Sequence, residues 1–360
     1  MKLDMENDFK VSIITVSYNA VKTIEQTIQS VVNQTYNNIE YLVIDGQSTD
    51  GTQDIIERYK DSISYYISEP DNGIYDAMNK GISYATGDIV GIINSDDWYE
   101  TDAIEKVVNC FNHTSADVVY GEIWLINEKG DKERQTRKSL IPPHPSMLVR
   151  RDIYQKYGKF DLSYKIAADY ELMLRFISKG VSFEHMDDIL ANFRVTGISN
   201  EKGWECAKET YEIELKYLDK CSRSFLDRNV AEEKYNKAKL LYISQNNPER
   251  IYRILNKKFE TLENGVVIFG AGTWGRELYA ILRNCNIPVK FFVDNEEIKW
   301  GLQLEGIQIF SPEILKNYNG YVLVAVKNYQ KDICRQLTNL SNSMLRWNTL
   351  EELWDKVIGC

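Results

Sequence analysis

The first hundred residues alternate between two kinds of apolar pattern. Short runs rich in apolar and β-branched residues predict strands, namely "KVSIITVS", "IEYLVIDG", "ISYYISE" and "DIVGII". Between them, apolar side chains recur every three or four residues, as in Ile24, Ile28 and Val31, which predicts helices. This rhythm predicts an α/β fold with a mostly parallel sheet and helices on both faces.

A polar loop follows each of the four predicted strands. These loops are residues 15–19, 45–50, 69–73 and 94–97. Parallel strands end at one edge of a sheet, and ligands bind there, where the strand order reverses. Four polar loops at one such edge predict a binding site.

The pattern changes along the rest of the chain. Residues 118–150 contain the turn "NEKGD" between apolar and mixed runs, which predicts an antiparallel hairpin, and 165–180 predict a helix. We therefore divide the chain into an α/β catalytic domain at 1–200, a charged helical connector at 201–260 and a Rossmann-like α/β domain at 261–360.

The second α/β region carries a glycine-rich motif. Gly270, Gly272 and Gly275 follow the run "VVIF", and Asp294 ends the next predicted strand. This spacing is typical of a dinucleotide-binding turn. About 100 residues leave no room for a dehydrogenase catalytic domain, so a nucleotide site and a structural or assembly role both stay open.

Two adjacent acids, Asp96 and Asp97, directly follow an apolar strand. Burying such a pair is costly because the carboxylates repel each other and lose water. Helix capping is a weak explanation, because the apolar rhythm of the next helix begins near Asp102. A divalent cation, Mn²⁺ or Mg²⁺, with a phosphate ligand explains the pair better.

The net charge and the cysteine content indicate which binding partners and which cellular compartment to expect. The chain has 360 residues and a formal net charge of −10, which argues against nucleic-acid binding. Its six cysteines are scattered, and there is no signal peptide or transmembrane run, so we expect a cytoplasmic protein.

Six segments together resemble a known family. They are "VSIITVSYNA", "QTYNNIEYLVIDGQSTDGT", "SEPDNGIYDAMNKGISYATGDIVGIINSDDWY", "HPSMLVRRDIYQKYGKFD", "KIAADYELMLRF" and "LANFRVTGIS". Their order over about residues 9–200 is similar to that of family 2 glycosyltransferases of the GT-A fold, especially the branch that builds bacterial O-antigen and capsular polysaccharides. The C-terminal region resembles small Rossmann-like modules appended to polysaccharide-biosynthesis enzymes.

The resemblance implies a role for each matching residue. The residues expected to bind the nucleotide are Val16, Tyr18, Asn19 and Asp45. Those expected to bind the donor sugar and diphosphate are Asn72, Gly73, Asp76, Lys80, Asn94 and Ser95. Asp96, supported by Asp97, is expected to bind the metal, and Asp169 to act as the catalytic base. Asn94 departs from the family, whose longer motif begins with aspartate, so metal binding rests mainly on Asp96. For Asp45 and Asp169, turn and helix-cap roles are compatible alternatives.

For two further residues, a functional and a structural role both stay open. His144 and Arg194 match positions near the acceptor or diphosphate, but a surface-loop histidine is as common. A basic run in the hairpin is either a solvated face or a contact for anionic lipid; it comprises Lys129, Lys132, Arg134, Arg137 and Lys138.

The resulting expectation is an inverting, metal-dependent glycosyltransferase. It would move a sugar from a nucleotide donor, expected to be a UDP-sugar, to a saccharide acceptor such as a lipid-linked intermediate at the inner face of the cytoplasmic membrane. The oligomeric state is open, and the appended domain is compatible with a homodimer. The alternatives are a sugar-nucleotide pyrophosphorylase, whose Gly-rich basic loop is missing after the first strand, and an NAD-binding regulatory protein.

Overall fold

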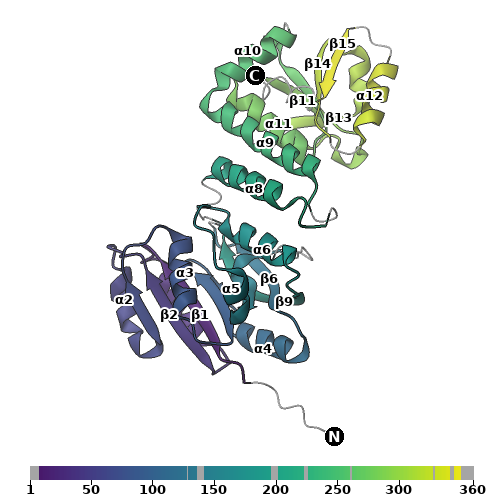
Figure 1. The fold of residues 1–360 in the computed structure, drawn as a ribbon. Helices are drawn as coiled ribbons and strands as arrows, with labels where there is room; N and C mark the ends of the chain where they lie inside the picture. Colours follow the sequence, from purple (N-terminus) through teal and green to yellow (C-terminus); the bar gives the residue numbers. More distant parts are fainter. Residues whose placement is uncertain are drawn as a thin grey trace. The chain divides into compact units, whose positions relative to one another are not determined.

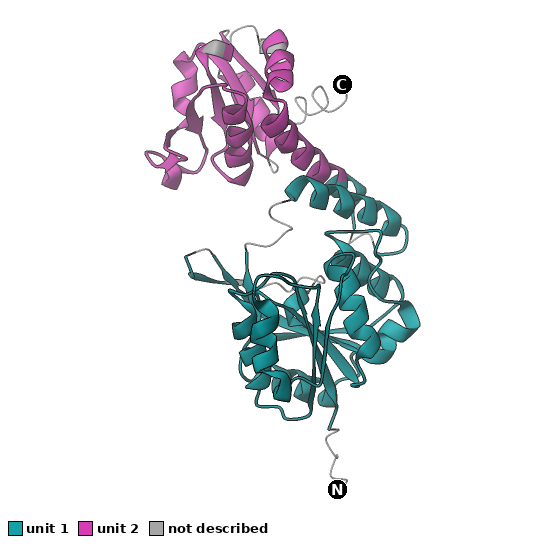
Figure 2. Ribbon diagram, turned by 90° about the vertical axis from the view of Figure 1, so that its left-hand side faces the viewer, with its two compact units in different colours: residues 1–231 teal, residues 232–360 magenta. Residues whose placement is uncertain are grey.

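The computed structural model describes residues 8–127, 129–135, 142–195, 202–222, 226–259, 262–326, 329–340 and 344–349. It divides into two compact units, Met1–Ala231 and Glu232–Cys360, coloured separately in Figure 2. The first unit extends beyond residue 200 because helix α8 (Gly203–Tyr217) packs Ile213 and Tyr217 against helix α6 (Ala168–Ser178).

Unit 1 is built on one sheet, which has nine strands in the described part of the chain (Figure 1). The strands are β1 (Val11–Ser17), β2 (Ile39–Asp45), β3 (Tyr65–Ser68), β4 (Ile89–Asn94), β5 (Trp98–Tyr99), β6 (Val118–Ile126), β7 (Lys132–Gln135), β8 (Met147–Arg150) and β9 (Phe183–Arg194). They lie in the order β3-β2-β1-β4-β8-β6-β9-β5, with β7 paired to β6.

The sheet is parallel from β3 to β4 and mixed beyond it. Strands β3, β2, β1 and β4 all run the same way, whereas β8 is antiparallel to both β4 and β6. Strands β6 and β7 form the predicted antiparallel hairpin. The chain passes from β1 to β2 on one side and later adds β4 on the other, so the strand order reverses at β1.

Helices cover both faces of this sheet (Figure 1). They are α1 (Ile24–Val32), α2 (Thr52–Arg58), α3 (Ile74–Tyr84), α4 (Ala103–His113), α5 (Arg151–Tyr157) and α6. One core joins α3, α5 and α6 to side chains such as Ile14 and Val90, and the other joins α1, α2 and α4 to the alternate side chains, such as Ile13 and Ile89. This alternation confirms the predicted α/β fold with helices on both faces.

Unit 2 is a smaller α/β unit. Its strands are β10 (Val266–Phe269), β11 (Val289–Val293), β12 (Gln303–Leu304), β13 (Ile307–Phe310), β14 (Gly320–Val324) and β15 (Leu345–Thr349), and its helices are α9 (Arg228–Asn246), α10 (Pro248–Phe259), α11 (Thr273–Asn284) and α12 (Gln330–Asn339). The sheet order is β12-β13-β11-β10-β14-β15, and only the β12–β13 pair is antiparallel among the described strands.

The glycine-rich turn of unit 2 depends on close packing between α11 and the end of β10. A Cβ atom added at Gly275 would lie 1.8 Å from the carbonyl oxygen of Gly270. Gly270 itself has a φ of 114°, a region that favours glycine. Gly272, by contrast, has open space where a Cβ would stand.

None of the helices in the described ranges combines the length and apolar character that crossing a bilayer requires.

The two glycines give a matched pair of substitutions in unit 2. We expect Gly275→Ala to lower the free energy of unfolding by about 3 kcal/mol, because the added methyl group overpacks the turn. Gly272→Ala should cost only about 0.5 kcal/mol, from a poorer helix cap. Hydrogen exchange of the β10 amides measures both, and equal protection in the two variants would contradict the packing argument.

Candidate active site

The parallel register gathers the predicted site at the carboxyl edge of the unit 1 sheet. Strand β1 pairs Ser17 with Asp45 of β2 on one side and Val16 with Asn94 of β4 on the other. The ends of β2 and β4 therefore flank the end of β1, at the point where the strand order reverses. Such a crevice is where open α/β sheets bind ligands.

Asp45 is fully buried at the end of β2. Its Oδ1 accepts hydrogen bonds from the hydroxyls of Ser17 at 2.9 Å and Ser48 at 2.5 Å. Its Oδ2 accepts from the Ser48 amide at 2.9 Å and the Ser68 hydroxyl at 2.7 Å. The carboxylate thus joins the ends of three strands, and a base or ribose contact would require one of these partners to give way.

The loop after β1 is fastened to the loop after β2. The Asn19 amide donates to the Ser48 hydroxyl at 2.8 Å, and the Thr49 amide donates to Asn19 Oδ1 at 2.9 Å. Val16 is buried, whereas Tyr18 beside Asn19 keeps 67% of its surface exposed. Of the predicted nucleotide-binding residues, Tyr18 is therefore the one whose ring is open to a ligand.

The loop before α3 has a different arrangement. Gly73 has a φ of 110°, which allows the chain to turn sharply into the helix. Asp76 Oδ2 accepts from the Asn72 amide at 3.0 Å, so Asp76 ties the preceding loop to the first turn of its helix. Lys80 pairs with Glu69 at 2.8 Å and donates to the Pro70 carbonyl at 3.0 Å. These predicted donor-binding side chains therefore hold the loop through local contacts.

The turn after β4 contains buried polar atoms without partners. Asn94 Oδ1 and Asp97 Oδ2 are buried and accept no hydrogen bond from the part of the chain that the structure describes. The other oxygen of Asp97 accepts from the Arg194 amide at 3.0 Å. Orphaned buried oxygens are uncommon and call for a partner such as an ion or water.

Arg194, at the end of β9, supplies the positive charge beside this turn. Its guanidinium donates to the Asp96 carbonyl and, at 2.7 Å, to Gln26 Oε1 of α1, and it lies 4.5 Å from the centre of the Trp98 ring. The structure thus brings Arg194 together with Asp96 and Asp97. Ser95 lies within the same turn and is half-buried.

The electrostatics of the two acids reflect their burial. Loss of water raises the pKa of Asp96 above its usual value. Burial and the neighbouring Asp96 charge raise the pKa of Asp97 well above its usual range, against the opposing effect of Arg194. A cation bound at this turn would relieve both effects, since it attracts the ionised form.

Asp169 lies in the first turn of α6, apart in sequence from the Asp96–Asp97 turn. Its Oδ1 is 3.0 Å from the Tyr75 hydroxyl and accepts from the Tyr170 amide at 2.9 Å. Its Oδ2 accepts no hydrogen bond from the described residues, and the side chain is only partly buried. One oxygen is therefore held while the other stays available.

His144 neighbours the Asp169 carboxylate. It begins the short 3₁₀ helix η2 (His144–Ser146), and its ring lies 6.2 Å from that of Phe160. Burial lowers its pKa, and the charge of Asp169 works in the opposite direction. A lowered pKa favours the neutral imidazole at neutral pH.

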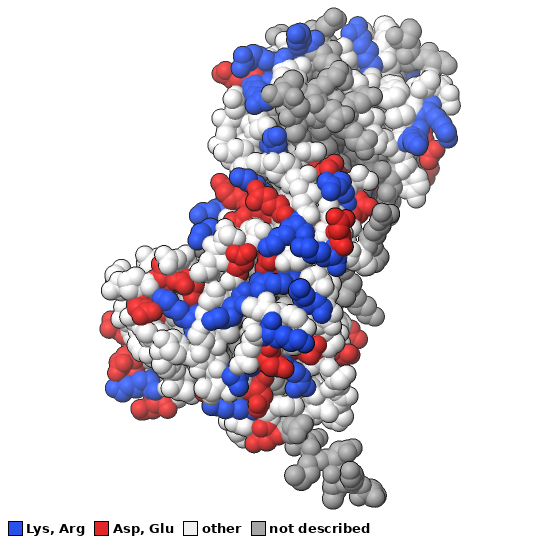
Figure 3. Space-filling view, viewed as in Figure 1, with Lys and Arg blue, Asp and Glu red and all other residues white. Residues whose placement is uncertain are grey.

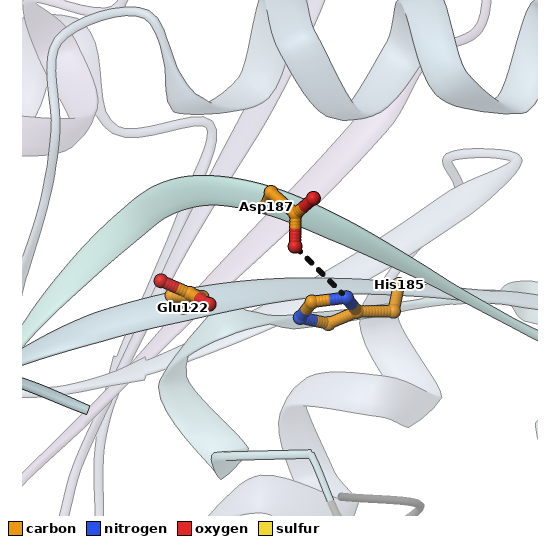
Figure 4. Close-up of side chains that lie close together, drawn as sticks. All are labelled: Glu122, His185 and Asp187. Atoms are coloured by element: carbon orange, nitrogen blue, oxygen red, sulfur yellow. Dashed lines mark ion pairs between the residues drawn. The ribbon is translucent and has the colours of Figure 1, made fainter. Parts of the chain in front are cut away.

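A second group of potential metal ligands lies on β6 and β9 (Figure 4). Glu122, His185 and Asp187 have ligand atoms within 4.8 Å of one another, the one such group of three among the residues described. His185 Nδ1 is 3.7 Å from Asp187 Oδ1, and the ring lies 5.1 Å from Tyr120. The His185 ring thus contacts both an aromatic side chain and a carboxylate, which is compatible with a structural role.

In unit 2, Asp294 holds the glycine-rich turn. Its carboxylate accepts from the Ala271 amide at 2.7 Å and the Glu296 amide at 2.9 Å, and pairs with Lys299 at 3.2 Å. The residue is 7% exposed. Gly270 and Gly272 lie between β10 and α11, and Gly275 lies in the first turn of α11, whereas the Asp294 carboxylate is occupied by protein groups.

Surface charge is mixed on the face of unit 1 that Figure 3 shows, where Lys and Arg side chains alternate with Asp and Glu. Of the predicted basic run, Lys129 is exposed and Lys132 donates to Asn192 at 3.2 Å. Arg137 and Lys138 lie outside the described residues, as does the side chain of Arg134.

Several site residues had no signal in the sequence. Gln26 and Thr27 come from α1, where Thr27 donates to the Asp97 carbonyl at 2.6 Å. In the sequence, nothing distinguishes Tyr75 from other helix residues, yet its hydroxyl donates a hydrogen bond to Asp169. Only their positions in space connect them to the predicted acids.

Comparison with known proteins agrees with this fold. The computed structure matches the mannosyltransferase PcManGT from Pyrobaculum calidifontis, solved in complex with GDP-Man and Mn²⁺, with a TM-score of 0.52 and 18% identity, over 63% of this chain and 70% of that one. Unit 1 therefore has the GT-A fold of glycosyltransferases.

Sequence comparison identifies the family. The family model described as glycosyl transferase family 2 matches residues 12–173. An uncharacterized glycosyltransferase of Mycobacterium tuberculosis strain H37Rv is 31% identical over 209 residues, which are 53% of this chain and 78% of the relative. The putative teichuronic acid biosynthesis glycosyltransferase TuaG of Bacillus subtilis is 29% identical over 238 residues, covering 60% of this chain and 93% of the relative. The chain belongs to glycosyl transferase family 2.

A second family model, described as C2185-like, N-terminal, matches residues 262–346, within unit 2.

The raised pKa of Asp97 gives a stability prediction with a defined sign. A buried carboxyl whose pKa is raised on folding destabilises the protein as pH rises through that pKa, because the folded state must then ionise it. Without divalent cations, we expect Asp97→Asn to be more stable than the wild type by about 1–3 kcal/mol at about pH 8, and the gap to close toward about pH 4.

Urea unfolding in the presence of a chelator measures this difference. The exposed Asp219 provides the control, since Asp219→Asn should leave stability unchanged at both pH values. An Asp97→Asn variant that is less stable than the wild type at the higher pH would contradict the assignment of an uncompensated buried charge.

Proposed function

We propose that unit 1 transfers a sugar from a nucleotide-diphosphate donor to a saccharide hydroxyl with inversion at the anomeric carbon. The observation that carries the proposal is the turn after β4, where Asn94 Oδ1 and Asp97 Oδ2 are buried without partners at the edge where ligands bind. A bound cation and diphosphate would supply what these atoms lack.

The residues present fit a divalent cation. Asp96 and Asp97 offer carboxylate oxygens and Asn94 an amide oxygen, which are the ligands that Mn²⁺ and Mg²⁺ prefer. When bound, the ion would neutralise charge on the leaving diphosphate. The mannosyltransferase with the similar fold was solved with Mn²⁺. Arg194 adds a positive charge at the same turn and holds Asp97 in place through its amide.

We assign proton removal from the acceptor hydroxyl to Asp169. Its Oδ1 is anchored by the Tyr75 hydroxyl and the Tyr170 amide, and its Oδ2 is open among the described residues. A base held at one oxygen can accept a proton at the other without reorienting. A single displacement assisted in this way inverts the configuration. His144, kept neutral by burial, is suited to hydrogen-bonding an acceptor or diphosphate oxygen.

The donor-side contacts follow from the open groups at the sheet edge. Tyr18 presents an exposed ring on which a base can stack, and Asp45 fixes the loops around it. We propose a UDP-sugar as donor, on the resemblance noted above. The relative named for teichuronic acid biosynthesis supports a saccharide acceptor, and we propose a lipid-linked intermediate of polysaccharide synthesis.

The other functions considered have less support. A pyrophosphorylase is not favoured, because the matched family consists of glycosyl transferases. A regulatory nucleotide site in unit 2 would have to displace the protein groups that occupy Asp294. We therefore assign the glycine-rich turn a structural role in the proposal.

Two substitutions separate donor binding from transfer. Asp96→Ala should weaken Mn²⁺-dependent donor binding by about 10²-fold or more, because the diphosphate loses its cation. Asp169→Ala should bind donor normally but slow transfer by about 10²–10⁴-fold. Isothermal titration with UDP-, GDP- and dTDP-sugars measures binding, and release of nucleoside diphosphate with p-nitrophenyl glycosides as acceptors measures transfer.

Asp187→Ala is the control, because it removes a carboxylate from the other acidic group while leaving Asp96 and Asp97 intact. We expect it to behave as the wild type. Loss of metal-dependent binding in Asp187→Ala, with Asp96→Ala unaffected, would place the cation on β6 and β9 and refute the assignment.

A further inference from the structure

The carboxylate of Glu209, on helix α8, binds the backbone segment that precedes α6. Glu209 Oε1 accepts from the Lys165 amide at 2.8 Å. Glu209 Oε2 accepts from the amides of Ile166 at 2.8 Å and Ala167 at 2.9 Å. Three consecutive backbone amides are thus held by a single side chain, and charge-assisted bonds of this kind are stronger than neutral ones.

The same segment is held from the opposite side by α3. The Tyr75 hydroxyl lies 2.6 Å from the Ile166 carbonyl oxygen and 3.0 Å from Asp169 Oδ1, so its proton is shared between them. The amide of Ile166 binds Glu209 while its carbonyl binds Tyr75. Residue 166 is therefore fixed on both sides, three positions before Asp169.

Other contacts place α8 beside the same carboxylate. Burial raises the pKa of Cys206, which lies one turn before Glu209 on α8, and the charge of Asp169 adds to this effect. Burial raises the pKa of the Tyr75 hydroxyl, and the charges of Asp169 and Glu209 both add to this effect. Two residues further along α6, the buried Glu171 accepts from Tyr217 of α8 at 2.6 Å and pairs with Lys216 at 3.0 Å.

An ordinary helix cap does not require this arrangement. The N-cap residue of α6, Ala167, has no side-chain oxygen to offer its own helix. The carboxylate comes instead from a residue 42 positions later in the chain. Its helix starts at Gly203, beyond residue 173, where the family match ends.

We propose that Glu209 is a positioning residue for Asp169: it fixes the entry into α6 and so sets the direction of the carboxylate that accepts the acceptor proton. This rests on the proposed function of Asp169. If residues 165–167 were held less tightly, the Asp169 carboxylate would shift away from the acceptor hydroxyl. Small displacements of reacting groups lower the rate of a reaction strongly. Donor contacts at β1, β2 and β4 would not be disturbed.

Glu209→Gln tests the proposal, because the amide has one acceptor oxygen and presents an N–H toward the backbone donors. We expect kcat for transfer to fall by about 10–10²-fold with donor KM unchanged. Glu209→Asp keeps the charge but shortens its reach, so it should lie between Glu209→Gln and the wild type. The control is Glu205→Gln, an exposed acid one turn earlier on α8, which should leave both constants unchanged.

A double mutant separates positioning from loss of stability. An Asp169→Asn variant lacks the carboxylate that Glu209 positions, so adding Glu209→Gln should cause no further loss of kcat. An equal loss in both backgrounds would overturn the proposal, since it would show that Glu209 acts on folding alone. Wild-type kcat in Glu209→Gln, alongside impaired transfer in Asp169→Asn, would overturn it while sparing the proposed function.

The proposed function fails separately, if Asp169→Asn transfers sugar as well as the wild type. Hydrogen exchange of the Lys165, Ile166 and Ala167 amides provides a readout that needs no substrate. These amides should be protected in the wild type and exchange faster in Glu209→Gln, and unprotected amides in the wild type would overturn the proposal.

Discussion

The candidate site depends on the parallel pairing of β1 with β2 on one side and β4 on the other. This register brings Asp45 and Asn94 to the two flanks of one strand end, although 49 residues separate them in the chain. Because backbone hydrogen bonds fix the register, every loop that follows these strands opens on the same edge. The predicted nucleotide and metal residues lie at the ends of β1, β2 and β4 or on the loops that follow them. The remaining predicted donor residues lie between β3 and the second turn of α3.

That edge contains two acidic groups in different electrostatic states. Asp45 has four hydrogen bonds and is satisfied in the protein alone. Asp97 is just as buried but keeps one oxygen without a partner, and its pKa is raised. The contrast separates a carboxylate that organises loops from one that the fold leaves uncompensated. Such uncompensated groups cost stability and are characteristic of functional sites.

The second half of the sheet and helix α8 complete the site from distant parts of the chain. Arg194, at the end of β9, contacts the turn after β4, and Glu209, on α8, contacts the segment before α6. A boundary at residue 200 separates α8 from the helix it packs against, whereas the compact unit keeps them together. The unit that carries the chemistry is thus larger than the part recognised by motif.

The sequence by itself determined the α/β class, the strand and helix pattern and the family, because apolar periodicity and turn residues are local signals. It also singled out Asp96 and Asp97, because two adjacent acids directly follow an apolar strand, and Asp169, through the resemblance to a known family. Only the tertiary structure decided that Asp45 and Asp294 are occupied, that Asp97 has an orphaned oxygen, and that Tyr75 and Glu209 hold the approach to Asp169. Those facts depend on which side chains are in contact in the folded chain. Contacts between residues as far as 97 positions apart have no periodic signal in the sequence.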